Sequence, residues 1–303
     1  MMTPARKLRV SAYLKKTVVL LCGVLSCLAV SARQEPAPGF KNDYLLIINT
    51  YSSNAPCSNA IINSVQNWLN TDNTTAVYVE HLNTLLIDSQ EEFGEVRREI
   101  FARYAARAPK IVLLIGNPVL ILRDDIRAHW GDVPIVSTAE MDFVSPDKEH
   151  LQTAAIPEQR RVPIAELADE YNLTFLQSRL FPQENVELLR HMVPGLRKVL
   201  LLGDGCYVNQ QLHYDMQRMM AEHYPGLEYE FISAADITTE ELLARLNTID
   251  TKTTGVLFSS WSCVSNVGGA TVLETYSFRV IANIPIPILS LIHISEPTRH
   301  AQI

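Results

Sequence analysis

Apolar runs alternate with amphipathic stretches along the body of the chain. Residues 44–49 (YLLIIN), 110–115 (KIVLLI) and 198–202 (KVLLL) are almost continuously hydrophobic, as is typical of strands buried on both faces of a parallel sheet. Segments with helical spacing lie between such runs, and residues 93–104 place apolar side chains on one helix face. The alternation predicts repeated strand–helix–strand units and therefore an α/β fold.

The alternation runs twice, with an irregular stretch between. We predict strands at 44–49, 76–81, 110–115, 133–137, 172–176, 198–202, 228–232, 255–258 and 284–291. We predict helices at 57–69, after Ser89, and at 120–130, 184–192, 210–223, 239–246 and about 266–281. Residues 43–143 are expected to form a first lobe and residues 184–291 an incomplete second lobe. Residues 144–183, which contain four prolines, cross between them. The predicted fold class is α/β, with two doubly wound parallel-sheet lobes and an interlobe cleft.

Two sequence patterns predict where helices begin. Ser89 is followed three residues later by Glu92, and this spacing matches a capping box, in which a hydroxyl and a carboxylate satisfy the first N–H groups of a helix. Thr238 and Glu241 repeat the pattern. We therefore expect helices to start directly after Ser89 and Thr238.

The charge of the chain is unevenly distributed. The 303 residues carry a net charge of −7, which argues against a nucleic-acid binder that relies on a basic surface. Residues 1–32 hold five basic residues and no acidic one, so the remainder carries 21 basic against 33 acidic residues. The apolar run 17–30 is shorter than the roughly 20 residues of a spanning helix.

The small residues that end at Ala32 suit a signal peptidase, so we expect residues 1–32 to be a secretory signal cleaved there or retained as an anchor. A lipoprotein signal and a buried helix of a cytosolic fold fit less well. The body is then periplasmic, free or tethered to the inner membrane.

The C-terminal residues 292–303 (IHISEPTRHAQI) differ in character from the predicted strand before them. The string resembles the translation of a sequencing adapter. We therefore expect that the natural reading frame is lost near Leu291, although a genuine polar tail is the alternative.

Loops at the predicted carboxyl ends of the strands are rich in hydroxyl, amide and aromatic groups. The candidate ligand-binding residues are Tyr51, Ser52, Ser53, Asn117, Glu140, Asp204, Cys206, Tyr207, Ser260 and Trp261. Such side chains suit a small polar or amphiphilic ligand, and ligands of open α/β sheets bind at these strand ends. The alternative for most of these residues is helix capping and turn formation.

Motifs for catalysis, cofactors and metals are not found in the sequence. The chain has no phosphate-binding P-loop, no dinucleotide fingerprint, no nucleophile elbow and no H-E-x-x-H pattern. The body keeps Cys57, Cys206 and Cys263, an odd number that allows at most one disulfide. We predict no cofactor, no metal site and no catalytic residue. An exported hydrolase would need a nucleophile with a base in reach, which no spacing supports.

Several segments resemble known ligand-binding proteins. Residues 185–204 (NVELLRHMVPGLRKVLLLGD) and 172–174 resemble the ABC-transporter substrate-binding-like family, which has the periplasmic-binding-protein fold. Residues 110–118 (KIVLLIGNP) and 124–140 (DDIRAHWGDVPIVSTAE) are similar to the extracytoplasmic sensor region of bacterial hybrid two-component histidine kinases. The resemblance spans about residues 43–291 and implies a bilobal fold that binds an unidentified small ligand.

The resemblance implies a sensor role first. In such sensors a membrane-spanning helix and a kinase core follow this region, and the sensor domains are expected to pair as homodimers. No kinase motif occurs in this chain, so kinase activity is not predicted for it. The alternative is a free-standing periplasmic substrate-binding protein of an ABC transporter.

Overall fold

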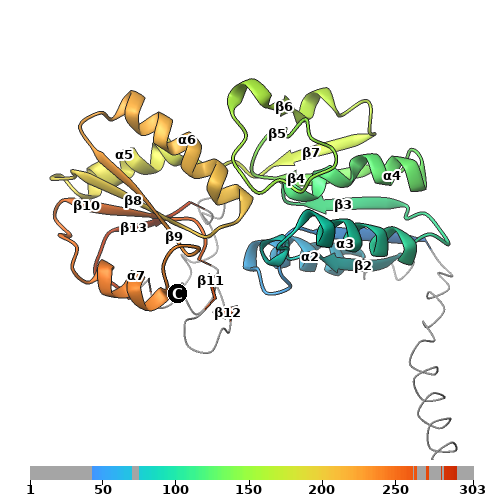
Figure 1. Ribbon diagram of the computed structural model, residues 1–303, viewed down its shortest axis with the longest axis horizontal. Coiled ribbons are helices and arrows are strands. Elements are labelled where there is room, and N and C mark those ends of the chain that lie inside the picture. The colour runs from blue at the N-terminus through green and yellow to red at the C-terminus, as the bar shows by residue number, and fades with distance from the viewer. Residues whose placement is uncertain are drawn as a thin grey trace, which may run out of the picture. The chain divides into compact units, whose positions relative to one another are not determined.

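Two parallel β-sheets with flanking helices form the part of the chain that the structure describes (Figure 1). The structure is a computed structural model, and it describes residues 43–69, 75–261, 263–264, 271–272, 281 and 283–291. All of these residues belong to one compact unit, Asn42–Ile303. The predicted signal segment, the C-terminal tail and most of the last predicted helix lie outside the described residues.

The first sheet has five parallel strands in the order β2-β1-β3-β4-β7. The strands are β1 (Tyr44–Asn49), β2 (Ala76–His81), β3 (Ile111–Ile115), β4 (Ile135–Ala139) and β7 (Leu173–Gln177). The strand predicted at 172–176 falls within the predicted crossover, and in the structure it is β7, which pairs with β4 as an edge strand of this sheet. The lobe boundaries themselves remain a prediction.

The second sheet has four parallel strands in the order β13-β10-β8-β9. The strands are β8 (Lys198–Gly203), β9 (Glu228–Ser233), β10 (Thr254–Phe258) and β13 (Ile288–Ser290). The first strand of each sheet along the chain lies between the second and the third, so both sheets start from the same doubly wound order. This topology confirms the predicted α/β fold class with two parallel sheets.

Helices follow most strands, as expected for right-handed crossovers between parallel strands. The helices are α2 (Pro56–Leu69), α3 (Gln90–Arg103), α4 (Arg123–Trp130), α5 (Pro182–Met192), α6 (Tyr207–His223) and α7 (Thr239–Leu246). Short 3-10 turns are η1 (Thr84–Leu86), η2 (Pro118–Leu122), η3 (Glu158–Arg160) and η4 (Ile164–Glu166). Two antiparallel pairs complete the described elements: β5 (Phe143–Val144) with β6 (Val162–Pro163), and β11 (Cys263–Val264) with β12 (Thr271–Val272). Among the described helices, none combines the length and the apolar character that membrane crossing requires.

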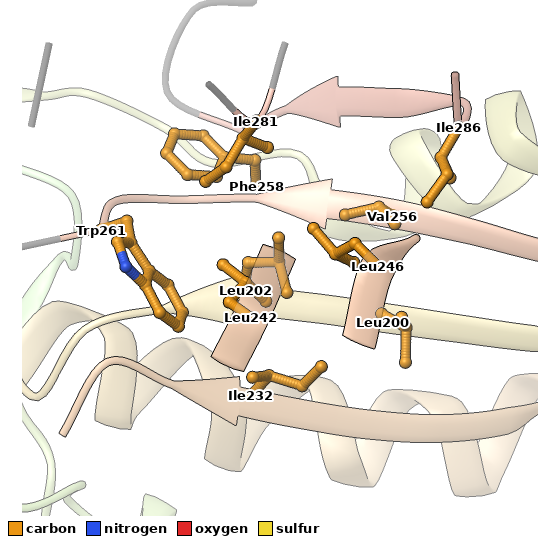
Figure 2. Packing of buried hydrophobic residues seen from close by; sticks show 10 residues of the cluster. All are labelled: Leu200, Leu202, Ile232, Leu242, Leu246, Val256, Phe258, Trp261, Ile281 and Ile286. Carbon is orange, nitrogen blue, oxygen red and sulfur yellow. The ribbon is translucent and has the colours of Figure 1, made fainter. Parts of the chain in front are cut away.

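The second sheet is covered on both faces because its side chains alternate between two cores. Leu200 and Leu202 of β8 point to one face and pack with Leu242 of α7 (Figure 2). Leu201 points to the other face, in a cluster that includes Met216 of α6. Burial on both faces explains why the sequence of β8 is continuously apolar.

The first sheet is built in the same way. Ile47 of β1 packs with Ile62 of α2 on one face. Tyr44 lies three residues before Ile47 and therefore on the other face, where its ring stacks on Tyr104 at the end of α3 with centroids 5.9 Å apart.

The helix starts agree with the capping patterns to different degrees. At α7 the full capping box is present, because the Thr238 hydroxyl accepts from the Glu241 N–H and the Glu241 carboxylate accepts from the Thr238 N–H. At α3 the Ser89 hydroxyl accepts from the N–H of Glu92, as predicted, but the Glu92 carboxylate accepts from the N–H of Asp88.

Helix α6 starts three residues earlier than the predicted 210. The N–H of Cys206 donates to the Asp204 carboxylate at 3.0 Å, and this turn positions Cys206 as the residue that caps the helix. Tyr207 therefore lies in the first turn of a helix and not in a loop.

Candidate functional site

Both sheets have a topological switch point, where successive strands continue on opposite sides of the first strand. In the first sheet the residues after β1 and β3 meet there, including Thr50, Tyr51 and Asn117. In the second sheet Asp204 follows β8 and Ser260 follows β10. Loops at a switch point diverge and leave room for a ligand, so these four strand ends form the candidate site.

Asp204 is the centre of a buried polar cluster in the second sheet. Its side chain is 3% exposed, and its Oδ1 accepts from Nδ2 of Asn209 at 2.7 Å. Its Oδ2 accepts from the Ser260 hydroxyl at 2.9 Å. The Asn209 amide also donates to the Ser260 oxygen at 2.7 Å, so three side chains link the ends of β8 and β10 to the first turn of α6.

Asn209 belongs to this cluster although it is not among the site residues predicted from the sequence. It lies five residues after Asp204, and the predicted start of the helix at 210 assigned it to the end of a loop. Its position inside the first helical turn is what directs its amide to Asp204.

Tyr51 and Glu140 form a second polar pair, in the first sheet. The Tyr51 hydroxyl donates to Oε1 of Glu140 at 2.9 Å, which joins the ends of β1 and β4. Oε2 of Glu140 is buried and has no hydrogen-bond partner among the described residues. Burial raises the pKa of Glu140 above its ordinary value, because desolvation penalises the carboxylate. Burial, reinforced by the negative charge of Glu140, also raises the pKa of Tyr51.

Gly116 allows this pair to approach β3. Its φ of +93° is one that L side chains rarely adopt. A Cβ at this position would lie 2.7 Å from Oγ1 of Thr50 and 3.2 Å from Cε2 of Tyr51. A glycine is therefore required for both the turn and the packing.

Contacts bring the strand ends of the two sheets near each other. A Cβ at Gly205, after β8, would lie 4.0 Å from Cδ1 of Leu85 in η1. Burial, with contributions from the charges of Asp204 and Glu140, raises the pKa of the Cys206 thiol well above its ordinary value. Cys206 is therefore a neutral thiol between two carboxylates and not an activated nucleophile.

Two of the predicted residues, Ser52 and Ser53, make hydrogen bonds within their own loop or to the start of α2. Ser52 is half-buried and its hydroxyl accepts from the N–H of Asn54 at 3.4 Å. Ser53 is exposed and its carbonyl accepts from the Asn59 amide. Both residues therefore shape the loop that leads into α2.

Asn117 is buried and bonded to the backbone of the connection between β4 and β5. Its Nδ2 donates to the Met141 carbonyl at 2.9 Å, and its Oδ1 accepts from the Met141 N–H at 3.1 Å. Tyr207 is buried in a cluster with Met141 and Phe143, and its hydroxyl donates to Gln211 at 3.5 Å. Asn117 and Tyr207 therefore both contact the segment that follows β4.

Trp261 lies in the core of the second sheet (Figure 2). Its side chain is 0% exposed, and its Nε1 donates to the Thr239 hydroxyl at 3.1 Å. The ring packs with Leu202 and Phe258 and has no surface left for a ligand in this conformation. A tryptophan three residues after a strand suggested a ligand contact in the sequence, because the sequence carries no information on which way the loop turns.

Two hollows among the described residues differ in their position relative to the strand ends. One of about 600 Å³ lies where α5 and α6 end, next to the amino end of β8, away from the strand ends at which α/β sheets bind ligands. A second, of about 20 Å³, has room for about one water molecule and is lined in part by Asn117 and Tyr207. The second hollow is the one that adjoins the candidate site. Within the described residues, no group of three or more His, Cys, Asp or Glu side chains is arranged to hold a metal ion.

Comparison with known proteins gives structural likeness only. No protein-family model matches the chain, and no curated protein matches it. A ligand-free, open substrate-binding protein with adhesive properties from Clostridium difficile is 14% identical, with a TM-score of 0.45 over 82% of this chain and 74% of that chain. An ABC domain in complex with L-Trp from Streptococcus pneumonia is 14% identical, with a TM-score of 0.48 over 81% of this chain and 73% of that one.

A third solved structure comes from a different functional class. A protein described as a putative LacI transcriptional regulator from Bacteroides fragilis is 10% identical, with a TM-score of 0.49 over 82% of this chain and 77% of that chain. At these identities and TM-scores the likeness does not select a function, and the fold assignment rests on the strand order of the two sheets.

Proposed function

We propose that this chain is an exported protein that binds a small solute at the carboxyl ends of its two parallel sheets. The observation that carries the proposal is the pair of buried or half-buried polar groups at those ends: Asp204 with Asn209 and Ser260, and Tyr51 with Glu140. The signal-like residues 1–32 support export, and the resemblance of residues 185–204 supports the binding-protein class.

The orphaned oxygen of Glu140 supports a ligand-binding role over a purely structural one. A buried acceptor without a partner costs free energy, about 1–3 kcal/mol from mutational data. Tyr51 satisfies only one of the two carboxylate oxygens. A donor group of a bound solute would satisfy the other, so the cost is recovered when the ligand binds.

Contacts to both sheets would couple binding to conformation. A solute that touches Glu140 from the first sheet and Ser260 from the second binds more tightly when the two strand ends are close. Binding therefore shifts the population toward the state in which the strand ends are close. The size of the shift depends on how much more tightly the solute binds that state than the state in which they are apart.

The proposed partner is an ABC transporter that receives the solute. The second candidate is the sensor part of a two-component histidine kinase, and the similarity of residues 110–118 and 124–140 to such sensors favours it. Long-read sequencing of the gene beyond the codon of Leu291 separates the two. A membrane-spanning segment followed by a kinase supports the sensor, whereas a stop after the completed lobe supports the free binding protein.

Binding is tested by thermal unfolding of the full chain with an amino acid, a sugar and an aromatic acid, namely L-tryptophan, D-allose and 3,4-dihydroxybenzoic acid. At a hundred times its Kd, a solute that binds only the folded chain stabilises it by about 2.7 kcal/mol and raises the unfolding temperature by about 5 to 10 °C.

The site assignment is tested by Asp204→Asn, which removes the charge that organises the cluster. We expect at least about a tenfold loss of affinity for the solute that binds, since hydrogen bonds to charged groups contribute about 1.5–3 kcal/mol.

Asp250→Asn is the matched control for that substitution. Asp250 accepts from the N–H two residues later at 3.0 Å, as Asp204 does, but lies at the amino end of β10. Ser260→Ala serves where Asp204→Asn reduces folding, as judged by circular dichroism. Equal affinities in all variants would contradict the assigned site.

A further inference from the structure

Arg123 is a buried cation whose guanidinium group has few polar partners among the described residues. It is the first residue of α4 and is 3% exposed. One nitrogen, Nη1, donates to the Leu120 carbonyl at 2.9 Å, while Nε is buried and has no hydrogen-bond partner among the described residues. Its guanidinium lies 5.6 Å from the centroid of the Tyr171 ring.

Carboxylates near Arg123 are engaged elsewhere. Of the described residues, no Asp or Glu oxygen lies within 4.0 Å of an Arg123 nitrogen. The adjacent Asp124 accepts from the Tyr171 hydroxyl at 2.6 Å and lies 3.5 Å from the Lys148 ammonium. The charge of Asp124 acts on Arg123 from beyond 4.0 Å and is shared with Lys148. A buried cation without a direct ion pair is costly, so the position of Arg123 favours an additional anionic partner.

The small hollow beside the candidate site offers room for that partner. Arg123 lines it together with Asn117, Ser145 and His150, and its volume of about 20 Å³ suits a single water molecule or an anion of similar size. The Ser145 oxygen accepts from the N–H of Asp147, which leaves its hydroxyl hydrogen available to the hollow.

The acidic residue in the wall of the hollow is satisfied by its own loop. Asp147 accepts through Oδ1 from the N–H groups of Glu149 and His150, and its Oδ2 lies 2.9 Å from Nδ1 of His150. These hydrogen bonds lower the pKa of Asp147 to about 2. These contacts hold the Asp147 carboxylate within its own loop, and among the described residues it forms an ion pair with His150 and not with Arg123.

We propose that the hollow beside Arg123 binds a small anionic acceptor, with Nε of Arg123 and the Ser145 hydroxyl as donors. The shared chemistry is one negatively charged atom, supplied either by a free halide ion or by a carboxylate oxygen of the solute. The halide source stands without the proposed function. The carboxylate source rests on it, because Asn117 and Tyr207 line the same hollow and adjoin the strand ends.

The test is thermal unfolding of the full chain in sodium chloride or bromide against sodium gluconate at equal ionic strength, since gluconate is too large for the hollow. At ten times its Kd a bound halide raises the unfolding temperature by about 3 to 6 °C. Arg123→Met should remove this rise.

Arg127→Met is the matched control for that substitution. Arg127 lies one helical turn later and 5.7 Å from the same Tyr171 ring, but is exposed and paired with Glu170. It should keep the full halide response. Loss of the response in both variants, or in neither, overturns the proposal.

Two measurements keep the proposal testable where Arg123→Met does not fold. Ser145→Ala removes one donor and should weaken the halide response several-fold. A crystal soaked in sodium bromide should show anomalous density within hydrogen-bond distance of Nε of Arg123. Absence of that peak, with an unchanged response in Ser145→Ala, overturns the proposal.

The source of the anion is decided by two pairs of ligands, each an acid and its amide. If the solute supplies a carboxylate, acetate and an aromatic acid should stabilise the chain and acetamide and the aromatic amide should not. Asp204→Asn separates this proposal from the proposed function, because it should weaken solute binding at least about tenfold and leave the response to halide or acetate unchanged. No stabilisation by any halide or carboxylate overturns the anion site while leaving solute binding to be judged on its own.

Discussion

At the residue scale, burial and hydrogen bonding decide which polar side chains are available to a ligand. Asn117 and Trp261 both follow strands and carry polar groups, yet their donors are used within the fold. Glu140 keeps an oxygen that no described residue hydrogen-bonds. The sequence predicts where such residues lie along the chain, but not which of them the neighbouring backbone will saturate, because that depends on contacts between distant segments.

Gly116 provides a residue-scale prediction about strain. Gly116→Ala places a Cβ at positive φ and 2.7 Å from Thr50, so we expect a loss of about 2–4 kcal/mol in the free energy of unfolding. Gly131→Ala is the matched control, because Gly131 has a φ of +74° but open space around its Cβ. It should cost only about 1 kcal/mol. Urea unfolding measures both, and equal losses would show that crowding at Gly116 contributes nothing.

Glu140 provides a prediction about pH. Because its pKa is higher in the folded chain than in the unfolded chain, the folded state binds the proton more tightly. Below the ordinary pKa of 4.5 the carboxyl group is protonated in both states and does not lower the free energy of unfolding. As pH rises from there through the folded-state pKa, the buried carboxylate lowers the free energy of unfolding progressively. Glu140→Gln does not titrate, so we expect its stability relative to wild type to increase from pH 4 to pH 7.

Urea unfolding at both pH values checks this expectation, with Glu149→Gln as the control at an exposed carboxyl of the same chain. A constant difference between wild type and Glu140→Gln across this range would contradict it.

At the element scale, the sequence predicts most strands and helices because their signals are local. Continuous apolar runs locate β1, β3 and β8, and the Thr238–Glu241 pattern locates the start of α7. Helix α6 starts earlier than predicted because Asp204 bonds to the N–H of Cys206, a contact that apolar spacing does not report. The edge position of β7 likewise depends on pairing with β4, nearly 40 residues earlier in the chain.

The capping box of α7 provides the element-scale prediction. Thr238→Ala removes the acceptor of the Glu241 N–H, and we expect a loss of about 1–2 kcal/mol in the free energy of unfolding. Thr248→Ala, at an exposed threonine just beyond the same helix, should change stability by no more than about 0.5 kcal/mol. Urea unfolding compares the two, and a Thr238→Ala protein as stable as wild type would show that the cap is dispensable.

At the scale of the whole molecule, the two sheets are linked by contacts that sequence analysis did not foresee. The segment before β7 bonds to α6, since the Ile156 N–H donates to Gln211 at 2.7 Å and Arg161 pairs with Asp215. Met141, Phe143 and Tyr207 add an apolar cluster between the same elements. These partners lie more than 50 residues apart in the chain, and only the folded arrangement of the two sheets brings them together.

Helix α6 takes part in both the candidate site and this linkage. Its first turn holds Asn209 against Asp204, and its later turns hold Asp215 and Arg218 against the segment that contains Arg161. A helix of 17 residues is a stiff rod about 25 Å long. Asn209 and Asp215 are therefore fixed to one stiff element, so the Asp204 cluster and the contact with Arg161 cannot shift independently of each other while the helix stays intact.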